Sequence, residues 1–435
     1  MLIFFLIIIS FVFYLIVFRS TDSIFVKPNL FKMVFFRDYL ILTMIPYCYY
    51  LYGNRYQDHY ILGQLNDGSY FYIAAIFAFV FMFFFLLTCR FFELPMNVLT
   101  KKVSYKIVYS RAIYTVNFLT LMMLFYFIFV SVKFDGGVIG LMKYPTSTLE
   151  VMRAKYTQGG GFFSLNKIIL KSWLPMLSYL SFYLYLKNPL KYKRVDKFIL
   201  KIALSLGLLS SVWFFEKSVV FFYLLGLVSI YVYSGRRLNK KFSMIIPFAA
   251  LGLVSLMYIL VNQDKIQDSN YLLDILLHRT SSQATGSVMA VHYFDSHDFL
   301  YLSGISNSLA ALVGENFQSP YSLLIDFYVP EYAETSGALS SFAVGEAYAL
   351  FGLIGVFLSG IIVGLYYSFF EATKHSNFLS VIFVGVYGLF FSHFYVASSF
   401  YGFLWPVGLA YQTIPFFIIA IIICDFKRDF NPSNI

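Results

Sequence analysis

Two arginines stand out among the residues of this chain that could bind a charged group. Arg153 and Arg279 each lie in a long hydrophilic stretch between apolar segments. A guanidinium group matches phosphate oxygens in a bidentate manner, which the ammonium group of lysine cannot do. Both arginines are therefore candidate ligands of a phosphate-bearing substrate. The alternative for each is an ion pair with a neighbouring carboxylate, such as Glu150 or Asp274.

Three further residues could take part in the same chemistry. Lys217 lies beside Glu216 in a short connection, where it could bind an anion or form an ion pair that fixes the turn. Glu346 lies several residues inside an apolar segment, a costly position unless the carboxylate faces a polar cavity. There it could act as a general base, or it could stabilise the first helical turns through the helix dipole. His278, next to Arg279, is the rival base.

The segments that must position these residues are apolar enough to cross a membrane. The chain is 60% hydrophobic and 21% aromatic, against roughly 45–50% apolar residues in ordinary soluble domains. A bilayer-spanning helix needs about 20 apolar residues, or about 17 at the lower limit. Eleven segments meet this requirement, at about 1–18, 36–52, 70–89, 112–131, 168–186, 198–215, 217–234, 243–262, 342–369, 378–396 and 404–424. The sequence therefore predicts an all-α, polytopic membrane protein that forms a single transmembrane domain over residues 1–435.

Lysine and arginine alternate between the connections, which predicts the orientation. By the positive-inside rule, the connections that hold most of the Lys and Arg face the cytoplasm. The cytoplasmic connections are then those that contain Arg19, Lys27, Lys32 and Arg37; Arg90, Lys101, Lys102, Lys106 and Arg111; Lys187, Lys191, Lys193, Arg194, Lys197 and Lys201; and Arg236, Arg237, Lys240 and Lys241. This places the N-terminus outside and the C-terminus inside, with two enlarged outer loops at about 131–167 and 262–341.

Other patterns point to packing or to the membrane surface and not to chemistry. Gly360 and Gly364 have the G-x-x-x-G spacing of closely packed helices. The apolar segment 299–313 is too short to span and is predicted to be re-entrant or interfacial. The net charge of +10 is spread over short clusters beside the spans, which indicates membrane topology and not nucleic-acid binding.

A metal site is not expected. The segment His292–Asp298 holds four potential ligands, but it lacks a recognised zinc spacing such as H-E-x-x-H. The three cysteines have no C-x-x-C spacing, which argues against a disulfide framework or a thiolate site.

Together these features resemble the Wzy-type O-antigen or oligosaccharide repeat-unit polymerases. The resemblance is carried by the many spans, the two enlarged outer loops with an arginine in each, and two local patterns. These are Phe214-Phe215-Glu216-Lys217-Ser218 and Gly345-Glu346-Ala347-Tyr348-Ala349-Leu350-Phe351-Gly352-Leu353-Ile354-Gly355, each of which opens a span.

The resemblance implies a GT-C-like glycosyltransferase of the bacterial inner membrane. Its substrates would be undecaprenyl-diphosphate-linked oligosaccharides, joined on the periplasmic face, and a chain-length regulator protein is an implied partner. Arg153, Arg279 and Lys217 would bind the diphosphates, and Glu346 or His278 would activate the acceptor, with no cofactor or metal. An O-antigen ligase and a lipid-linked oligosaccharide flippase or other transporter are the alternatives.

Overall fold

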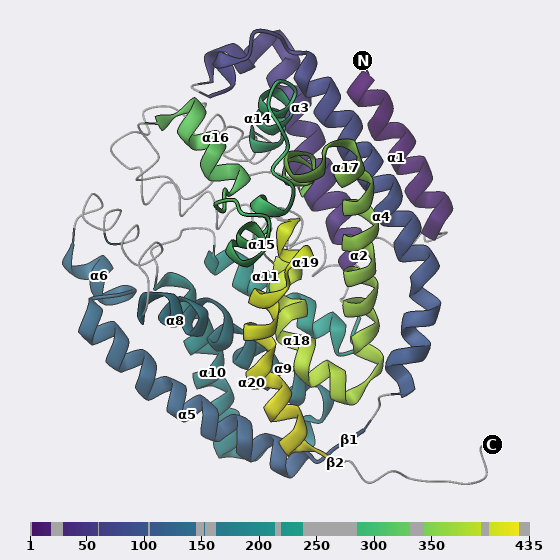
Figure 1. The fold of residues 1–435 in the computed structure, drawn as a ribbon. Helices are drawn as coiled ribbons and strands as arrows, with labels where there is room; N and C mark the ends of the chain where they lie inside the picture. Colours follow the sequence, from purple (N-terminus) through teal and green to yellow (C-terminus); the bar gives the residue numbers. More distant parts are fainter. Residues whose placement is uncertain are drawn as a thin grey trace. The chain divides into compact units, whose positions relative to one another are not determined.

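In the computed structural model, most of the described residues form helices (Figure 1). The structure describes residues 2–18, 29–59, 61–102, 105–144, 152, 162–213, 219–237, 285–330, 343–392 and 400–425. The chain divides into two compact units. The first contains residues 1–94, 237–368 and 393–409, and the second contains residues 95–236, 369–392 and 410–435. Each unit is described by itself.

The described part of the first unit is helical. Its helices are α1 (Leu2–Phe18), α2 (Leu30–Met33), η1 (Val34–Met44), α3 (Ile45–Leu51), η2 (Tyr52–Asp58), η3 (Leu62–Gln64), most of α4 (Ser69–Lys102), α14 (Thr285–Phe294), η8 (Tyr301–Gly304), α15 (Asn307–Leu312), α16 (Pro320–Tyr328), most of α17 (Ala343–Ala372) and α19 (Tyr401–Leu404). Segment 299–313, which was predicted to be re-entrant or interfacial, contains the two short helices η8 and α15.

The second unit contains the remaining helices and one short strand pair. Its helices are the end of α4, α5 (Tyr109–Phe134), α6 (Val138–Lys143), α8 (Phe162–Ile168), η4 (Ile169–Trp173), α9 (Leu174–Lys187), η5 (Pro189–Lys191), α10 (Arg194–Val212), α11 (Val219–Tyr233), the end of α17, η10 (Thr373–His375), α18 (Asn377–Ser392) and most of α20 (Val407–Ile423). Strand β1 (Lys106–Ile107) pairs antiparallel with β2 (Cys424–Asp425).

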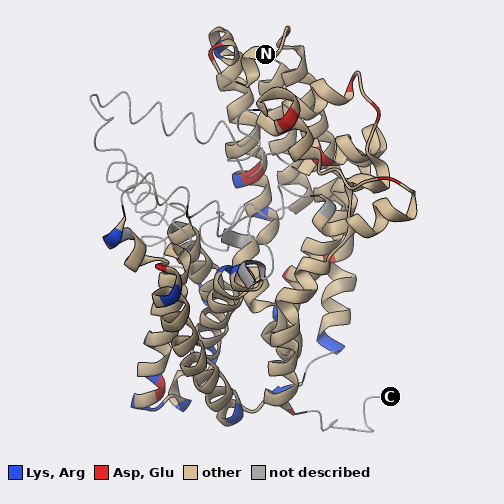
Figure 2. Cartoon of the chain, turned by 60° about the vertical axis from the view of Figure 1, so that its left-hand side comes forward, with Lys and Arg blue, Asp and Glu red and all other residues tan. Residues whose placement is uncertain are grey.

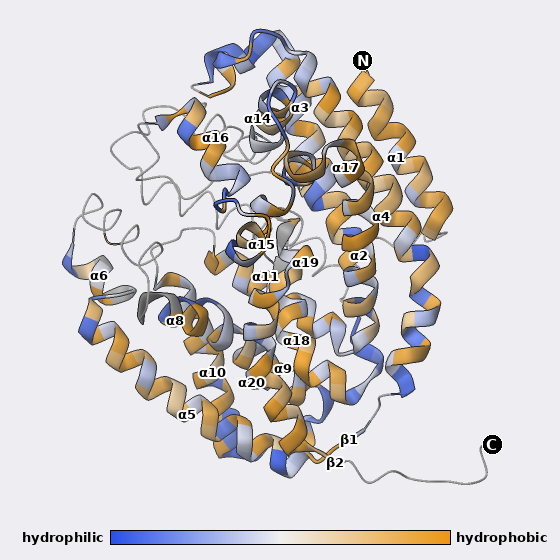
Figure 3. Ribbon diagram, viewed as in Figure 1, coloured by the Kyte–Doolittle hydropathy of each residue, from blue (hydrophilic) through white to orange (hydrophobic). Residues whose placement is uncertain are grey.

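Apolar helices indicate that the chain is a membrane protein. Three described helical stretches are long and apolar enough to cross a bilayer, namely α4, α5 and Ala343–His375, which joins α17 to η10. Helices α1 and α20 are shorter and also apolar, and Figure 3 shows both largely in the hydrophobic colour. The side chain of Phe125 on α5 is 72% exposed, which suits contact with lipid. Lys and Arg lie mostly toward helix ends (Figure 2).

Most of the predicted apolar segments coincide with described helices, but two of them are not uniform α-helices. Segment 36–52 becomes the π-helix η1 followed by α3, and segment 168–186 becomes the π-helix η4 followed by α9. In both cases the α-helix has a proline in its first turn, Pro46 or Pro175. Proline offers no backbone N–H and crowds the carbonyl one turn earlier, so the preceding turn widens. Segment 243–262 lies outside the described residues.

Within the first unit, α4 and α17 pack closely at two glycines. A Cβ atom at Gly360 would lie 2.5 Å from the carbonyl oxygen of Phe81, and one at Gly364 would lie 2.8 Å from Cβ of Thr88. No side chain larger than hydrogen fits at such distances. The predicted role of the G-x-x-x-G spacing in helix packing is confirmed.

Candidate functional site

Glu346 lies in the first turn of α17 and is fully buried, with 0% of its surface exposed. The neighbouring Ala343, Val344 and Ala347 are buried as well. A buried carboxylate is costly unless hydrogen bonds or an opposite charge compensate for the lost water. Burial of an acidic residue among small side chains is therefore the first sign of a functional position in this unit. Arg153, Arg279, Lys217 and His278 lie outside the described residues.

The helix that carries Glu346 is broken one and a half turns later. Phe351 and Gly352 have non-helical backbone angles, and Gly352 has φ 60° and ψ −144°. This combination is accessible essentially only to glycine. The break separates a short helical segment, residues 343–350, from the long apolar remainder of α17.

A loop from a distant part of the sequence fills the break. A Cβ atom at Gly352 would lie 2.9 Å from the ring of Phe299, so the absence of a side chain lets this ring approach the backbone. The amide of Leu300 donates a hydrogen bond to the carbonyl oxygen of Ala349 over 3.0 Å. The break frees carbonyl groups from the α-helical pattern, and this bond satisfies one of them.

Aromatic contacts hold the same loop against the short segment. The Phe299 ring packs edge-on against the Tyr348 ring, with centroids 5.5 Å apart. The ring centroids of Tyr301 and Phe351 are 6.4 Å apart. Tyr348 also contacts Phe77 of α4 at 5.0 Å. In membrane proteins, irregular backbone is tolerated where protein surrounds it or where it lines a cavity, and discontinuous helices often carry binding sites. The broken helix and the buried acid thus mark the same place.

A hydrogen bond between a histidine of α14 and a tyrosine of α16 joins these two helices. Nδ1 of His292 and the hydroxyl of Tyr328 are hydrogen bonded, and either group can be the donor. Tyr70 packs edge-on against the His292 ring at 4.8 Å. The side chain of Gln64 donates a hydrogen bond to the carbonyl oxygen of Tyr328 over 2.6 Å. Burial lowers the pKa of His292 below its usual value, and the nearby charge of Asp295 opposes this shift.

A second aromatic group lies on the exposed side of α14. The rings of Tyr293 and His297 stack with centroids 4.0 Å apart, and Phe327 of α16 packs edge-on against Tyr293 at 5.0 Å. Phe327 is 55% exposed. Among the described residues, the His and Asp side chains of segment 292–298 form no cluster of three that could hold a metal ion.

The sequence stretch that contains α14, α16 and Glu346 carries acidic side chains but neither lysine nor arginine. From Thr280 to Thr373 the chain contains no Lys or Arg. The same stretch contains the carboxylates Asp295, Asp298, Glu315, Asp326, Glu331, Glu334, Glu346 and Glu371. A phosphate-bearing ligand needs cations to offset its charge. For such a ligand the stretch from Thr280 to Thr373 would need cations from elsewhere in the chain, and Arg153, Arg279 and Lys217 are the candidates that the sequence predicts.

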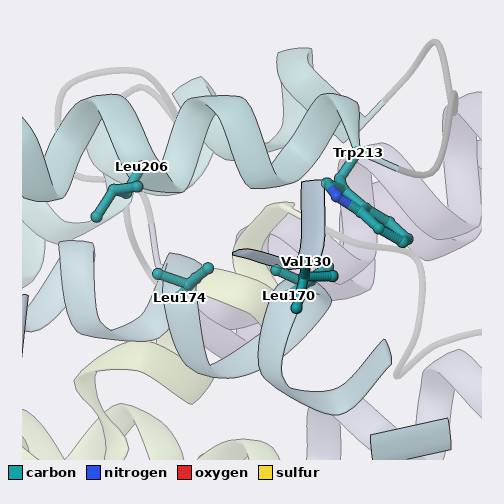
Figure 4. Packing of buried hydrophobic residues seen from close by; sticks show 5 residues of the cluster. All are labelled: Val130, Leu170, Leu174, Leu206 and Trp213. Carbon is teal, nitrogen blue, oxygen red and sulfur yellow. The ribbon is translucent and has the colours of Figure 1, made fainter. Parts of the chain in front are cut away.

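In the second unit, the sequence neighbours of two candidate cations belong to one hydrophobic cluster. Its buried members are Val130, Leu170, Leu174, Leu206 and Trp213 (Figure 4). Met152, which directly precedes Arg153, packs against this cluster, and Trp213 lies four residues before Lys217. The core of this unit therefore anchors the chain next to both candidates.

Trp213 is fixed in place by polar contacts as well as by packing. Its indole Nε1 donates a hydrogen bond to Oγ of Ser131 over 3.1 Å, and its carbonyl oxygen accepts one from the amide of Gly137 over 3.1 Å. A Cβ atom at Gly136 would lie 2.1 Å from the indole ring, so only glycine permits this contact. The start of the predicted outer loop 131–167 is thereby tied to the residue that precedes the Phe214–Ser218 pattern.

The sequence predicted Glu346 as a candidate base, which stays a prediction, but it did not predict the broken helix or the contact of Phe299 with Gly352. The Gly345–Gly355 pattern contained the signal, because Gly352 interrupts an otherwise helical apolar segment. It did not show which residue packs against the glycine. Glu346 belongs to the first unit, whereas Met152 and Trp213 belong to the second.

No family model, no curated protein and no solved structure matches this chain.

Proposed function

We propose that this protein is a membrane glycosyltransferase that polymerises undecaprenyl-diphosphate-linked oligosaccharide repeat units on the periplasmic face of the bacterial inner membrane. The product would be O-antigen or a related surface polysaccharide. The proposal includes a GT-C-like arrangement of eleven spans, with the N-terminus outside and the C-terminus inside. It rests above all on the buried Glu346, which lies on a short helical segment set off by the break at Gly352.

In the proposed reaction, Glu346 acts on the acceptor. A hydroxyl of the acceptor sugar attacks the anomeric carbon of the donor glycan and forms the new glycosidic bond. The bond between that carbon and the diphosphate oxygen breaks, and undecaprenyl diphosphate leaves with the electron pair. Glu346 takes the proton of the attacking hydroxyl, with His278 as the alternative base.

The donor and its leaving group need positive charge, which the stretch from Thr280 to Thr373 does not supply. Arg153 and Arg279, with Lys217, would bind the diphosphate and offset the charge that develops as it leaves. The packing of Met152 and Trp213 in one cluster supports a shared contribution from the Arg153 and Lys217 segments. With three cations at the leaving group, the proposal requires no metal or cofactor.

Deletion of the gene in its native strain tests the proposal. Loss of a polymerase should leave lipopolysaccharide capped with a single repeat unit. Accumulation of unattached polymer would instead identify a ligase. Lipid-linked units trapped on the cytoplasmic side would identify a flippase. Purified protein should also extend lipid-linked repeat units in vitro, with undecaprenyl diphosphate released at each step.

A further inference from the structure

Side-chain hydroxyl groups join several helix ends of the second unit. Oγ1 of Thr100, near the end of α4, donates a hydrogen bond to the carbonyl oxygen of Ala372 over 3.0 Å. The hydroxyl groups of Tyr233, at the end of α11, and Thr373 are 2.8 Å apart. The ends of α4 and α11 are therefore both fixed to the segment where α17 passes into η10.

Tyrosines extend this network to α9 and α18. The hydroxyl of Tyr183 donates a hydrogen bond to Oγ of Ser380 over 3.0 Å. The ring of Tyr233 contacts those of Tyr183 and Tyr387, with centroids 5.7 and 4.5 Å apart. These buried contacts make the helix ends a firm support for the charged residues that follow them.

The described carboxylate at this place is already used within the network. Glu371 is buried, and one of its oxygens pairs with the ammonium group of Lys374. Its other oxygen accepts a hydrogen bond from the hydroxyl of Tyr387 over 3.1 Å. Glu371 thus contacts both a cation and a hydroxyl group within this network.

Four exposed basic residues surround this network, and we call them the basic rim: Lys101, Lys187, Arg236 and His375. Lys101 follows Thr100 directly, and the ammonium group of Lys187 lies 5.5 Å from the centre of the Tyr183 ring. A guanidinium nitrogen of Arg236 donates a hydrogen bond to the carbonyl oxygen of Leu186 over 2.9 Å.

Two lysines of the basic rim, Lys101 and Lys187, both disfavour the positively charged form of His375. His375 interacts electrostatically with Lys374, Lys101 and Lys187, while Glu371 is the acidic residue that acts on it. Like charges held together by buried contacts cost free energy unless a bound anion offsets them. The basic rim is therefore suited to bind an anion.

We propose that the basic rim binds the phosphate of an anionic phospholipid head group. The residues lie at the ends of apolar helices, where a head group would meet them, and their charge complements a phosphodiester. The distribution of Lys and Arg in the sequence assigns this side to the cytoplasm, where anionic lipids attract basic residues next to membrane helices. This site does not depend on the transferase reaction.

Lipid binding by the full-length protein tests the site. The purified protein is titrated with phosphatidylglycerol in a phosphatidylcholine background, and bound lipid is counted by native mass spectrometry. Lys101→Ala combined with Lys187→Ala should weaken phosphatidylglycerol binding about 25-fold, because each basic residue near an anionic lipid contributes roughly fivefold. Replacing both lysines with arginine should restore binding, which separates lost charge from a folding defect.

Lys191→Ala combined with Lys197→Ala is the matched control. Both are exposed lysines of the same unit, and the double variant removes the same total charge. This control should weaken binding clearly less than the Lys101 and Lys187 double variant does, because neither Lys191 nor Lys197 belongs to the basic rim. An equal loss in both double variants would overturn the site. Equal binding of phosphatidylcholine would also overturn it, and displacement of the lipid by equimolar inorganic phosphate would assign the site to free phosphate instead.

Discussion

The amide of Leu300 and the carbonyl oxygen of Ala349 are joined by a hydrogen bond of 3.0 Å, directly before the break in α17. This bond connects the loop after α14 to the short helical segment that carries Glu346. With the Phe299 ring against Gly352, it holds that segment at a fixed place relative to α14. The position of the proposed base thus depends on a loop about fifty residues earlier in the chain.

The first prediction concerns Glu346. Gln has nearly the same shape but cannot accept a proton, so Glu346→Gln should preserve folding and lower turnover about 10²–10⁴-fold. Polymer formation from purified lipid-linked repeat units measures the effect. Glu93→Gln is the control, because Glu93 is an exposed partner of Arg90 on α4. Normal turnover by Glu346→Gln together with inactive His278→Gln would make His278 the base.

The second prediction concerns the break in α17. Gly352→Ala places a Cβ atom against Phe299 and forces an unfavourable backbone conformation, so it should destabilise the protein by about 1–3 kcal/mol. Thermal unfolding in detergent measures this change. Gly408→Ala is the control, because a Cβ atom there meets nothing within 4 Å. Adding Phe299→Ala should recover only part of the loss, since it removes the clash and leaves the backbone strain. Full recovery would show that Gly352 is needed only for space.

The third prediction concerns the core of the second unit. Trp213→Ala removes a buried ring from the cluster with Val130 and Leu170 and should cost about 3–5 kcal/mol. Trp213→Phe keeps most of the packing but loses the hydrogen bond to Ser131, and it should cost about 0.5–1.5 kcal/mol. Trp405→Ala serves as the control because that residue is 41% exposed. A similar loss of stability at both tryptophans would contradict the anchoring role of Trp213.

The fourth prediction concerns pH. Burial lowers the pKa of His292 below the value of about 6.5 expected in the unfolded chain. Below about pH 6.5 the unfolded state binds more protons at His292 than the folded state does. The contribution of His292 to stability therefore rises with pH in this range. This contribution is complete above about pH 6.5, and it falls as the pH drops toward the folded-state pKa. Thermal midpoints between pH 5 and 8 should therefore vary less in His292→Gln than in the original protein. An unchanged dependence would show that another group is responsible.

The fifth prediction tests the two arginines. In a background without the native cysteines, single cysteines at positions 153 and 279 should react with an impermeant reagent from outside. A cysteine at position 193 should react only after the inner side is opened.

Arg153→Lys and Arg279→Lys should each leave an inserted protein with strongly reduced polymerisation, because lysine cannot form the bidentate contact. Normal polymer length and amount in both variants would defeat the proposed role.

The sequence determined the helical, membrane-bound character of the chain. Apolar segments long enough to span a bilayer are a local property, and helix formation within them needs only contacts a few residues apart. The predicted segments 70–89 and 112–131 accordingly lie within α4 and α5. The close packing at Gly360 and Gly364 could also be predicted from the sequence, because small residues at that spacing favour helix contact.

Only the tertiary structure decided which residues meet. The spans are apolar on most of their surface, so hydrophobic periodicity does not tell a face that packs against protein from one that faces lipid. The break at Gly352 depends on Phe299, and the place of Trp213 depends on Ser131 and Gly136. Such contacts join positions far apart in the chain, and many apolar pairings are nearly equivalent until steric fit and buried hydrogen bonds select one of them.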